Sequence, residues 1–352
     1  MIKTQIRICF FFILLFTACQ KDFGEVNTAE SDYIYGKGLF IVNEGMYGQG
    51  NASISFYSFE TNNMYNAVFY TANQRPLGDV ATSMLRNGEY VYIVLNNSAK
   101  IEIVRLSDFV SVKSISLNYL PLFITAINEN YAYLSNLSYP GFHLIDLKTA
   151  AYVQDVYTGK STQQILAYQD YCFFTNWSNY YITANNNTVQ RIDTQTNQLH
   201  DSIIVGKEPN SMVLDKYNKI WVLSSGGYLG EEYPRLVCFN PLSLQKEKEL
   251  VFPFKSMSPK ALCVNPAGDS LFFLNTSVYA MSVNDSILPT QAFIEAGTRN
   301  FYAMSIAPDN RIFLSDALDY QQNGDIYIYS SSAKLLHQSK AGIIPSFFYF
   351  VE

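Results

Sequence analysis

The sequence has few of the residues with which proteins build metal centres and disulfide frameworks. Its 352 residues include three histidines and five cysteines. The histidines, His143, His200 and His337, are far apart in the chain, and no HxxH, HExxH or CxxC spacing occurs. These absences argue against a zinc site of the usual spacing, a cysteine–histidine catalytic pair and a disulfide framework. A phosphate-cradling glycine loop is also missing, and the acidic residues after Asp316 do not match a calcium-binding EF-hand loop.

The chain lacks an apolar run long enough to span a bilayer. The longest run, residues 8–16, follows Lys3 and Arg7 and precedes small residues. A short apolar run with a basic start and a small-residue end is typical of an export signal rather than a membrane helix.

The end of this run resembles a bacterial lipoprotein cleavage box. The text LFTAC, residues 15–19, carries the resemblance, which implies a signal peptide over residues 1–18 and acylation of Cys19. The next residues, QKD, resemble the export tag of Bacteroidota surface lipoproteins. Acyl chains, each worth roughly 0.8 kcal/mol per buried methylene, would anchor the protein in the outer membrane, facing the cell exterior. A plain secretory signal with an incidental cysteine is the alternative.

Three regions follow from this interpretation. Residues 1–18 are the expected signal peptide. Residues 19–37, which start with Cys19 and are rich in Asp, Glu, Asn and Gly, are expected to form a flexible tether. Residues 38–352 remain for the folded domain.

Positive charge is in deficit. The chain has 24 Lys and Arg against 30 Asp and Glu, and removal of Lys3 and Arg7 leaves 22 against 30, a net charge of −8. A chain of this sign is a poor general binder of nucleic acid. The mature domain keeps three cysteines, Cys172, Cys238 and Cys263, each inside apolar strand text. We expect them to be buried free thiols.

The sequence is rich in one repeated phrase, an aromatic residue that opens a short apolar strand ending in Asn, Asp or Ser. Its copies are FIVN at Phe40, YIVLN at Tyr92, YLSN at Tyr133, FFTN at Phe173, WVLSS at Trp221, FFLN at Phe272 and FLSD at Phe313. The leading aromatic recurs at intervals of 52, 41, 40, 48, 51 and 41 residues. Such periods, without helical segments between them, are typical of propeller blades. Seven copies predict an all-β, seven-bladed β-propeller with four antiparallel strands per blade.

The first blade lacks an inner strand of its own, because the polar sequence of the expected tether precedes Phe40. The remaining text places the blades at residues 38–70, 78–117, 121–157, 161–205, 209–252, 259–293 and 300–340. Ile343 to Phe350, IIPSFFYF, is an apolar strand left over after the seventh blade. We expect this C-terminal strand to complete blade one and close the ring, since closure removes edges open to aggregation.

The phrases YLSN, FFTN and IDTQTNQ resemble the YVTN or YncE-like seven-bladed propeller repeat over most of residues 38–350. GLFIVNEG near the start, with SDALDYQQNGDIYIY and GIIPSFFYF at the end, resembles surface lipoprotein propellers of Bacteroidota. That group captures cobalamin or ferric siderophores as partners of TonB-dependent outer-membrane transporters. The resemblance implies a non-enzymatic capture protein that needs no cofactor or metal of its own.

The loops are unequal on the two sides of the predicted disc. In a four-stranded blade, the loops between the second and third strands emerge on the side of the connections between blades, which we call the crossing face. Its loops carry eight aromatic residues that we expect to form a ligand-binding rim: Tyr47, Tyr139, Trp177, Tyr180, Tyr181, Tyr228, Tyr233 and Tyr320. Rings with a polar tip give large contact area at low entropic cost, which suits a large, flat or macrocyclic ligand. The alternative is that these rings cover loop backbone and pack on one another.

Cations recur in the connections between blades. Six of the seven connections carry one: Arg75, Lys160, Lys207, Lys255, Arg299 and Lys340. In an acidic chain this pattern predicts a positive central funnel that attracts an anion, which favours a ferric siderophore over nearly neutral cobalamin. We include Arg75, Lys207 and Arg299 among the expected ligand contacts, with Asp319 for polar substituents. Simple turn preference for Lys and Arg, and hydrogen bonding of Asp319 to its own loop, are the alternatives.

Other functions use the same fold. Propellers include sugar-lactone hydrolases and quinoprotein dehydrogenases, and propellers in general host many functions. Glu44, Asn176 and Asp316 keep a metal-dependent lactonase open, because such a site needs carboxylates and amides near the centre of the ring. A protein- or glycan-interaction module is a further alternative. The missing histidine and cysteine patterns favour capture over catalysis.

Overall fold

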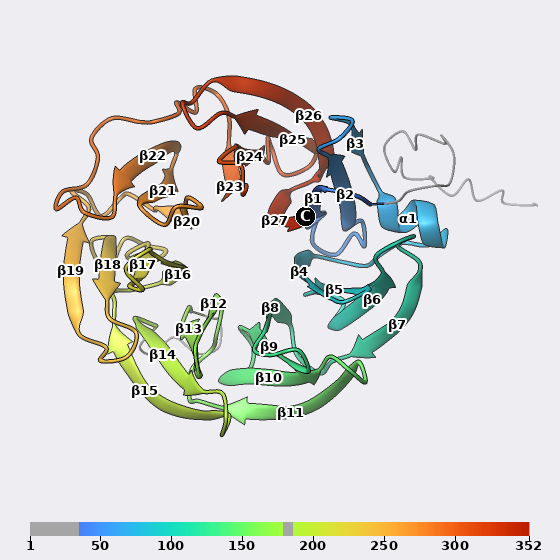
Figure 1. The fold of residues 1–352 in the computed structure, drawn as a ribbon, viewed down its shortest axis with the longest axis horizontal. Coiled ribbons are helices and arrows are strands. Elements are labelled where there is room, and N and C mark those ends of the chain that lie inside the picture. Colours follow the sequence, from blue (N-terminus) through green and yellow to red (C-terminus); the bar gives the residue numbers. More distant parts are fainter. Residues whose placement is uncertain (1–34, 179–185, 352) are drawn as a thin grey trace, which may run out of the picture.

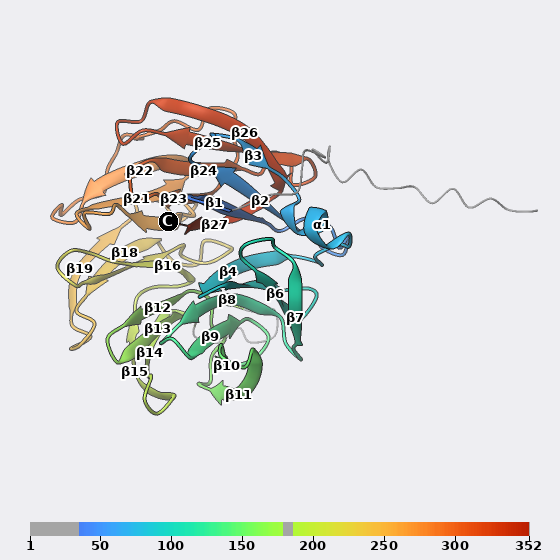
Figure 2. The same ribbon diagram turned by 45° about the vertical axis from the view of Figure 1, so that its right-hand side comes forward.

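The chain folds into a closed ring of seven antiparallel β-sheets (Figure 1). The computed structural model describes residues 35–178 and 186–351. It confirms the predicted seven-bladed propeller, with the blades following one another around the ring in chain order (Figures 1 and 2). The expected signal peptide, Cys19 and the rim residues Tyr180 and Tyr181 lie outside the described residues.

Each blade is counted outward from the ring axis. The inner strands are β27 (Pro345–Val351), β4 (Ala81–Asn87), β8 (Pro121–Ala126), β12 (Ile165–Tyr168), β16 (Pro209–Leu214), β20 (Lys260–Val264) and β23 (Phe301–Ile306). The second strands are β1 (Gly38–Asn43), β5 (Tyr90–Leu95), β9 (Tyr131–Asn136), β13 (Tyr171–Thr175), β17 (Ile220–Ser224), β21 (Ser270–Asn275) and β24 (Ile312–Asp316).

The third strands are β2 (Ser53–Ser58), β6 (Lys100–Arg105), β10 (Gly141–Asp146), β14 (Thr188–Asp193), β18 (Arg235–Phe239), β22 (Ser277–Ser282) and β25 (Asn323–Tyr329). The outer strands are β3 (Met64–Tyr65), β7 (Ser111–Ser116), β11 (Ala151–Tyr157), β15 (Gln198–Ile204), β19 (Lys246–Val251) and β26 (Leu335–Ile343). Alternating apolar residues from facing blades fill the spaces between sheets, so the core is a series of layers around the ring.

The C-terminal strand closes the ring as predicted. Strand β27 pairs antiparallel with β1, from Gly38 opposite Val351 to Asn43 opposite Pro345. Beyond the strand, Glu44 N donates to Ile344 O at 2.9 Å, which extends the pairing toward the crossing face. The first blade is therefore built from both ends of the chain, and no open sheet edge remains at the junction.

The repeated phrase has a structural reason at its last two positions. A hydroxyl in the phrase accepts a hydrogen bond from the backbone of the inner strand: Ser135 Oγ from Phe123 N (3.1 Å), Thr175 Oγ1 from Gln164 N (3.0 Å) and Ser315 Oγ from Ala303 N (2.9 Å). The Asn or Asp at the last position bonds to the segment that leads into the same blade: Asn43 to Gly342 at the end of β26, Asn176 to Ser161 and Asp316 to Asn300. In these blades the phrase therefore fixes the crossing end of the inner strand.

Those hydroxyls satisfy backbone groups that a β-bulge leaves unpaired. The register of six inner strands slips at the crossing end, between Ala81 and Ser83, Pro121 and Ile124, Pro209 and Ser211, Lys260 and Cys263, Phe301 and Met304, and Pro345 and Phe347. In blade four, Gln163 and Gln164 both bond to the backbone of Thr175. A bulge re-aims the extra side chain, so this repeated irregularity directs residues toward the ring axis.

Blade one departs from the expected four full strands. The sequence placed residues 64–70 in an outer strand, but β3 has only two residues and helix α1 (Val68–Asn73) follows it. Ala67 has φ of 53°, which turns the chain out of the sheet, and Val68 and Phe69 bury themselves between blades one and two. No helix in the described residues has the length and apolarity to cross a membrane.

Blade six also has a reduced outer edge. Its sheet contains β20, β21 and β22, and the place of the fourth strand is held by an isolated bridge between Val278 and Ile294. The residues between them include Asp285, whose carboxylate accepts a hydrogen bond from Ser282 N. They also include Pro289, which has no N–H group to donate to a neighbouring strand. These residues turn the chain before a full strand can form.

Tyr35 lies outside the expected boundary of the propeller, in text assigned to the tether. Its ring is buried and lies 5.1–5.4 Å from the ring centroids of Phe40, Phe56 and Phe109. The packed domain therefore begins at least three residues earlier than predicted, because an aromatic side chain gains more from this pocket than from water.

The three thiols agree with expectation. Cys172 and Cys238 are buried, Cys263 is partly buried, and all three are free.

Ring closure predicts a strong effect of Phe348→Ala. Phe348 is 8% exposed and packs between the first and last blades, with its ring centroid 6.5 Å from that of Phe313. We expect the free energy of unfolding, measured by denaturant titration, to fall by about 3 kcal/mol. Phe254→Ala, at a phenylalanine that is 61% exposed, is the matched control and should change it by less than about 0.5 kcal/mol. Equal losses in the two variants would contradict the role of β27 as the closing strand.

Candidate functional site

Four side chains from three consecutive blades meet near the ring axis at the crossing end, and we call them the axial cluster. Glu44 follows β1 of blade one, and Ser346 lies in β27 of the same blade. Tyr302 is the second residue of β23, and Lys260 opens β20. All four are partly exposed, unlike most of the strand residues around them.

Tyr302 links the members of the axial cluster. Its hydroxyl donates to Glu44 Oε1 at 3.2 Å, and the Lys260 ammonium lies 4.5 Å from the centre of its ring. Tyr320 contacts the same ring edge-on, with centroids 5.8 Å apart. The tyrosine therefore holds a carboxyl group and an ammonium group at different places around one ring.

The charges of the axial cluster are perturbed by their surroundings. Burial raises the pKa of Glu44 to about 7, although Ser346, Tyr302 and Lys260 oppose the rise. Burial also lowers the pKa of Lys260, against the attraction of Glu44. The two groups are not within ion-pair distance, since Lys260 has no ion pair among the described residues. A carboxyl group whose pKa lies near neutral pH, beside an ammonium group without an ion pair in a partly enclosed place, is typical of functional sites.

The crossing face carries the most exposed aromatic residues of the described chain. Four aromatic side chains are more than 60% exposed: Tyr228 (96%), Tyr47 (77%), Tyr157 (70%) and Phe254 (61%). Tyr47 and Tyr228 were predicted, whereas Phe254 in a connection and Tyr157 at the end of β11 were not. All four lie at the crossing end of their blades. Tyr233 and Tyr320 from the predicted rim are also exposed.

Blade five adds a concave surface to this face. A pocket of about 500 Å³ lies between the loop at Gly227–Gly230 and the connection at Lys255–Ser258. Tyr228, Leu229 and Met257 give it apolar area, and Lys255 gives it a cation. A concave apolar surface with a few polar groups is the usual form of a small-molecule site.

Two predicted rim residues are packed rather than free. Tyr139 lies against Tyr119, His143 and Tyr157, with ring centroids 5.0–6.5 Å apart. Trp177 is partly buried, and its backbone oxygen accepts a hydrogen bond from Ser161. For Tyr139 the ring contacts match the packing alternative.

Asp319 serves its own loop. Its carboxylate accepts from Gln321 N and Gln322 N at 3.0 Å and from the Gln322 side chain at 2.9 Å. The hydrogen bonds from Gln322 and Gln321 lower the pKa of Asp319 to about 2. Its oxygens are thus already used by the loop.

Half of the connection cations are paired with carboxylates. Three of them form ion pairs: Arg75 with Glu102 (2.8 Å), Lys207 with Glu231 (2.6 Å) and Lys340 with Asp325 (2.8 Å). The other three lie against neutral groups: Lys160 Nζ donates to Thr188 Oγ1, Lys255 Nζ to Glu231 O, and the Arg299 guanidinium lies 4.7 Å from the Tyr327 ring centre. The expected positive funnel is therefore much weaker than the residue count implied.

The residues of the lactonase alternative have other partners. Asn176 Nδ2 donates to Ser161 O and Gln190 Oε1, and Asp316 accepts from two backbone N–H groups of its own blade. Within residues 35–178 and 186–351, no group of three or more His, Cys, Asp or Glu side chains is arranged to hold a metal ion.

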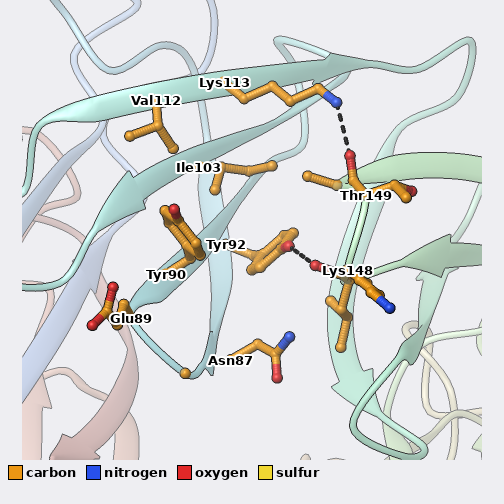
Figure 3. Close-up of a pocket in the computed structure, with 12 residues that line it drawn as sticks. Asn87, Glu89, Tyr90, Tyr92, Ile103, Val112, Lys113, Lys148 and Thr149 are labelled. Carbon is orange, nitrogen blue, oxygen red and sulfur yellow. Dashed lines mark hydrogen bonds between the residues drawn. The ribbon is translucent and has the colours of Figure 1, made fainter.

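The opposite face also has a pocket, between blades two and three (Figure 3). It encloses about 470 Å³, and both hydrogen bonds drawn there join the two blades. Tyr92 OH donates to Leu147 O at 2.6 Å, and Lys113 Nζ donates to Thr149 O at 2.9 Å. Because these groups already bond to each other's blades, the pocket serves blade packing.

Sequence reasoning missed Lys260, Tyr302 and Ser346, since it examined loops and connections for ligand contacts. A signal was present. Lys260 and Ser346 each follow a proline at the start of an inner strand, as do Leu122 and Asn210. Among these four residues, Lys260 is the only cation.

Comparisons with known proteins agree with the fold. The family model described as Domain of unknown function (DUF5074) matches residues 37–333. A search of curated proteins finds no match.

Solved structures with this fold have varied activities. A protein described as quinonprotein alcohol dehydrogenase-like, from Bacteroides thetaiotaomicron, has a TM-score of 0.70 at 16% identity, covering 90% of this chain and 78% of its own. The periplasmic gluconolactonase of Pseudomonas aeruginosa has a TM-score of 0.67 at 11% identity, covering 90% and 99%. Hydrazine synthase of Kuenenia stuttgartiensis has a TM-score of 0.62 at 11% identity, covering 80% and 90%. Identities this low show a shared fold and leave function open.

The raised pKa of Glu44 predicts a pH-dependent loss of stability. The folded state holds this proton more tightly than the unfolded state, so the stabilisation is complete below about pH 4.5 and is lost as pH rises through about 7. In Glu44→Gln this loss is absent. From pH 4 to pH 8 we expect the unfolding free energy of the variant to rise by about 3 kcal/mol relative to the unmodified protein.

Denaturant titrations at both pH values measure the difference. Glu89→Gln removes an exposed carboxyl on the opposite face and controls for net charge. If the unfolding free energies of the Glu44 variant and the unmodified protein differ by the same amount at both pH values, the assignment is contradicted.

Proposed function

The chain belongs to the DUF5074 domain family, and we propose that this member is a non-enzymatic capture protein whose crossing face binds a large metal-chelate nutrient. A ferric siderophore is the favoured ligand, and a corrinoid is the second candidate. The proposal extends to a surface lipoprotein, anchored through Cys19, that passes its ligand to a TonB-dependent outer-membrane transporter.

The observation that carries the proposal is that the four most exposed aromatic side chains among the described residues all lie on one face. Tyr47, Tyr157, Tyr228 and Phe254 come from three blades, and each is exposed by more than 60% of its surface. Exposed rings cost free energy in water, and their concentration at the crossing ends marks a surface that is covered in use. Tyrosine rings contact flat or macrocyclic molecules over a large area while their hydroxyls stay hydrated.

The size of the face suits a large ligand. The pocket beside Tyr228 and Leu229 in blade five has room for one part of a large ligand, a part of a few hundred cubic ångströms. Tyr47 and Tyr320 lie in other blades, one and seven, so the aromatic side chains are spread over a wide area. A single small metabolite would leave most of these rings exposed. A chelate of drug size or larger covers more of them.

The ligand preference rests on fewer charges than the sequence suggested. Arg75, Lys207 and Lys340 are paired with carboxylates, which reduces the expected attraction for an anion. Lys255 at the blade-five pocket and Lys260 near the axis form no ion pair with any residue that the structure describes. These two cations support an anionic chelate over a nearly neutral one.

The place of Tyr35 bears on the anchor. Its ring packs at the junction of blades one and two, so a tether from Cys19 joins the ring there. Fifteen residues lie between the two positions. An extended chain of that length reaches about 55 Å, which lets the crossing face turn away from a membrane and toward a transporter.

Ligand capture predicts measurable quenching of tryptophan fluorescence by a ferric catecholate. Trp177 lies on the crossing face, while Trp221 is buried in the core and gives the background signal. Replacing both Tyr47 and Tyr228 with alanine should weaken binding tenfold or more, about 1.4 kcal/mol, because two exposed contact surfaces are lost. Tyr217→Ala, at an exposed tyrosine on the opposite face, is the matched control and should leave the affinity unchanged.

Cyanocobalamin in the same titration separates the two candidate ligands. Calorimetry that detects binding of neither compound, or equal weakening by the control and the double variant, would contradict capture by the crossing face.

A further inference from the structure

We infer that the axial cluster of Glu44, Lys260, Tyr302 and Ser346 is a subsite for a carboxylate group, with Lys260 as its main contact. The inference rests on the proposed function for its role, since it states where an acidic arm of the captured molecule is held. The probe ions described below test the subsite by itself.

Lys260 has no partner for its charge. Among the described residues its ammonium makes no hydrogen bond and no ion pair, and its one polar contact is the face of the Tyr302 ring, 4.5 Å away. A partly buried ammonium normally finds a carboxylate or a carbonyl. Three connection lysines do so: Lys207 pairs with Glu231, Lys340 pairs with Asp325, and Lys255 donates to the backbone oxygen of Glu231. Lys260 is thus a cation beside the axis that is free to bind an anion.

Glu44 does not neutralise this cation, although it is close enough to affect it. The carboxyl is turned to the hydroxyl of Tyr302, and the backbone of Glu44 is fixed by its hydrogen bond to Ile344 O. Burial raises its pKa to about 7, so at neutral pH a large fraction of the molecules carry it protonated. In that form the axial cluster is net positive and presents O–H and N–H donors.

A second polar atom near the carboxyl has no partner except the carboxyl itself. Ser346 Oγ is buried without a hydrogen-bond partner at normal distance. It lies close enough to Glu44 to lower the pKa of that carboxyl. An incoming carboxylate accepts from Lys260 Nζ directly, and a small shift of Tyr302 or Ser346 supplies further donors.

The cluster is continuous with the exposed aromatic face. Tyr320, which is exposed, stands edge-on against Tyr302 at 5.8 Å. A ligand whose ring covers Tyr320 therefore brings its acidic arm toward Lys260. This continuity distinguishes the axial cluster from the opposite-face pocket of Figure 3, whose tyrosine and lysine donors already bond to backbone.

Binding of an anion and binding of a cation differ in their effect on Glu44. The groups that face its carboxyl are Tyr302 from β23, Lys260 from β20 and Ser346 from β27. A carboxylate beside them adds negative charge, raises the pKa of Glu44 and causes proton uptake. An ammonium ligand would lower the pKa and release a proton. The sign of the change therefore identifies the class of ligand.

The test follows the Glu44 carboxyl carbon by NMR in protein labelled with ¹³C-glutamate, with Glu44→Gln used for assignment. The midpoint of its titration is measured in chloride, in acetate and in methylammonium at equal ionic strength. We expect acetate to raise the midpoint by about half a pH unit or more and methylammonium to leave it unchanged. Lys260→Met should abolish the effect of acetate.

Lys216→Met is the matched control, because Lys216 also lies over a tyrosine ring, 5.2 Å from the centre of Tyr217, but on the opposite face. It should keep the full acetate effect. An acetate effect that persists in Lys260→Met, or a lowered midpoint in methylammonium, would overturn the inference. If acetate acts as expected while ferric catecholate fails to bind, the subsite stands and the proposed capture of a chelate fails.

Discussion

The pairing of β27 with β1 is the constraint on which the rest of the structure depends. A ring of blades has no free edges only if its two ends meet, and here the meeting point lies inside one sheet. The same pairing builds the axial cluster, because it brings Ser346 from the C-terminal strand beside Glu44 at the other end of the chain. Stability and the candidate binding surface therefore share one structural element.

Most of the fold was predictable, because every blade needs the same kinds of residue at the same positions of the repeat. Each phrase supplies an apolar strand, and in several blades a hydroxyl and an amide or carboxylate that secure a bulge, as Ser135, Asn176 and Asp316 show. The outer edges were less predictable. Helix α1 and the bridge at Ile294 depend on how residues pack between neighbouring blades, which the period of the repeat does not encode.

The site was predictable only in part. Exposure of Tyr47 and Tyr228 followed from loop position, which the repeat sets. The fate of the cations did not, because Arg75 finds Glu102 on the third strand of the next blade, 27 residues along the chain. Lys260 escaped notice for the opposite reason. It belongs to a strand and looks structural in the sequence, yet among the described residues its ammonium lies over the Tyr302 ring without an anionic partner.

The central claim is that the crossing face, from its exposed rings to the axial cluster, is where this protein holds a ligand. A crystal structure of the protein with a bound ferric catecholate tests it most directly. The account predicts a chelate on the crossing face, with aromatic contacts to Tyr228 or Tyr320. It also predicts an acidic group within hydrogen-bonding distance of Lys260 Nζ, at most about 3.5 Å. A chelate bound on the opposite face, in the pocket beside Tyr90 and Tyr92, would contradict it.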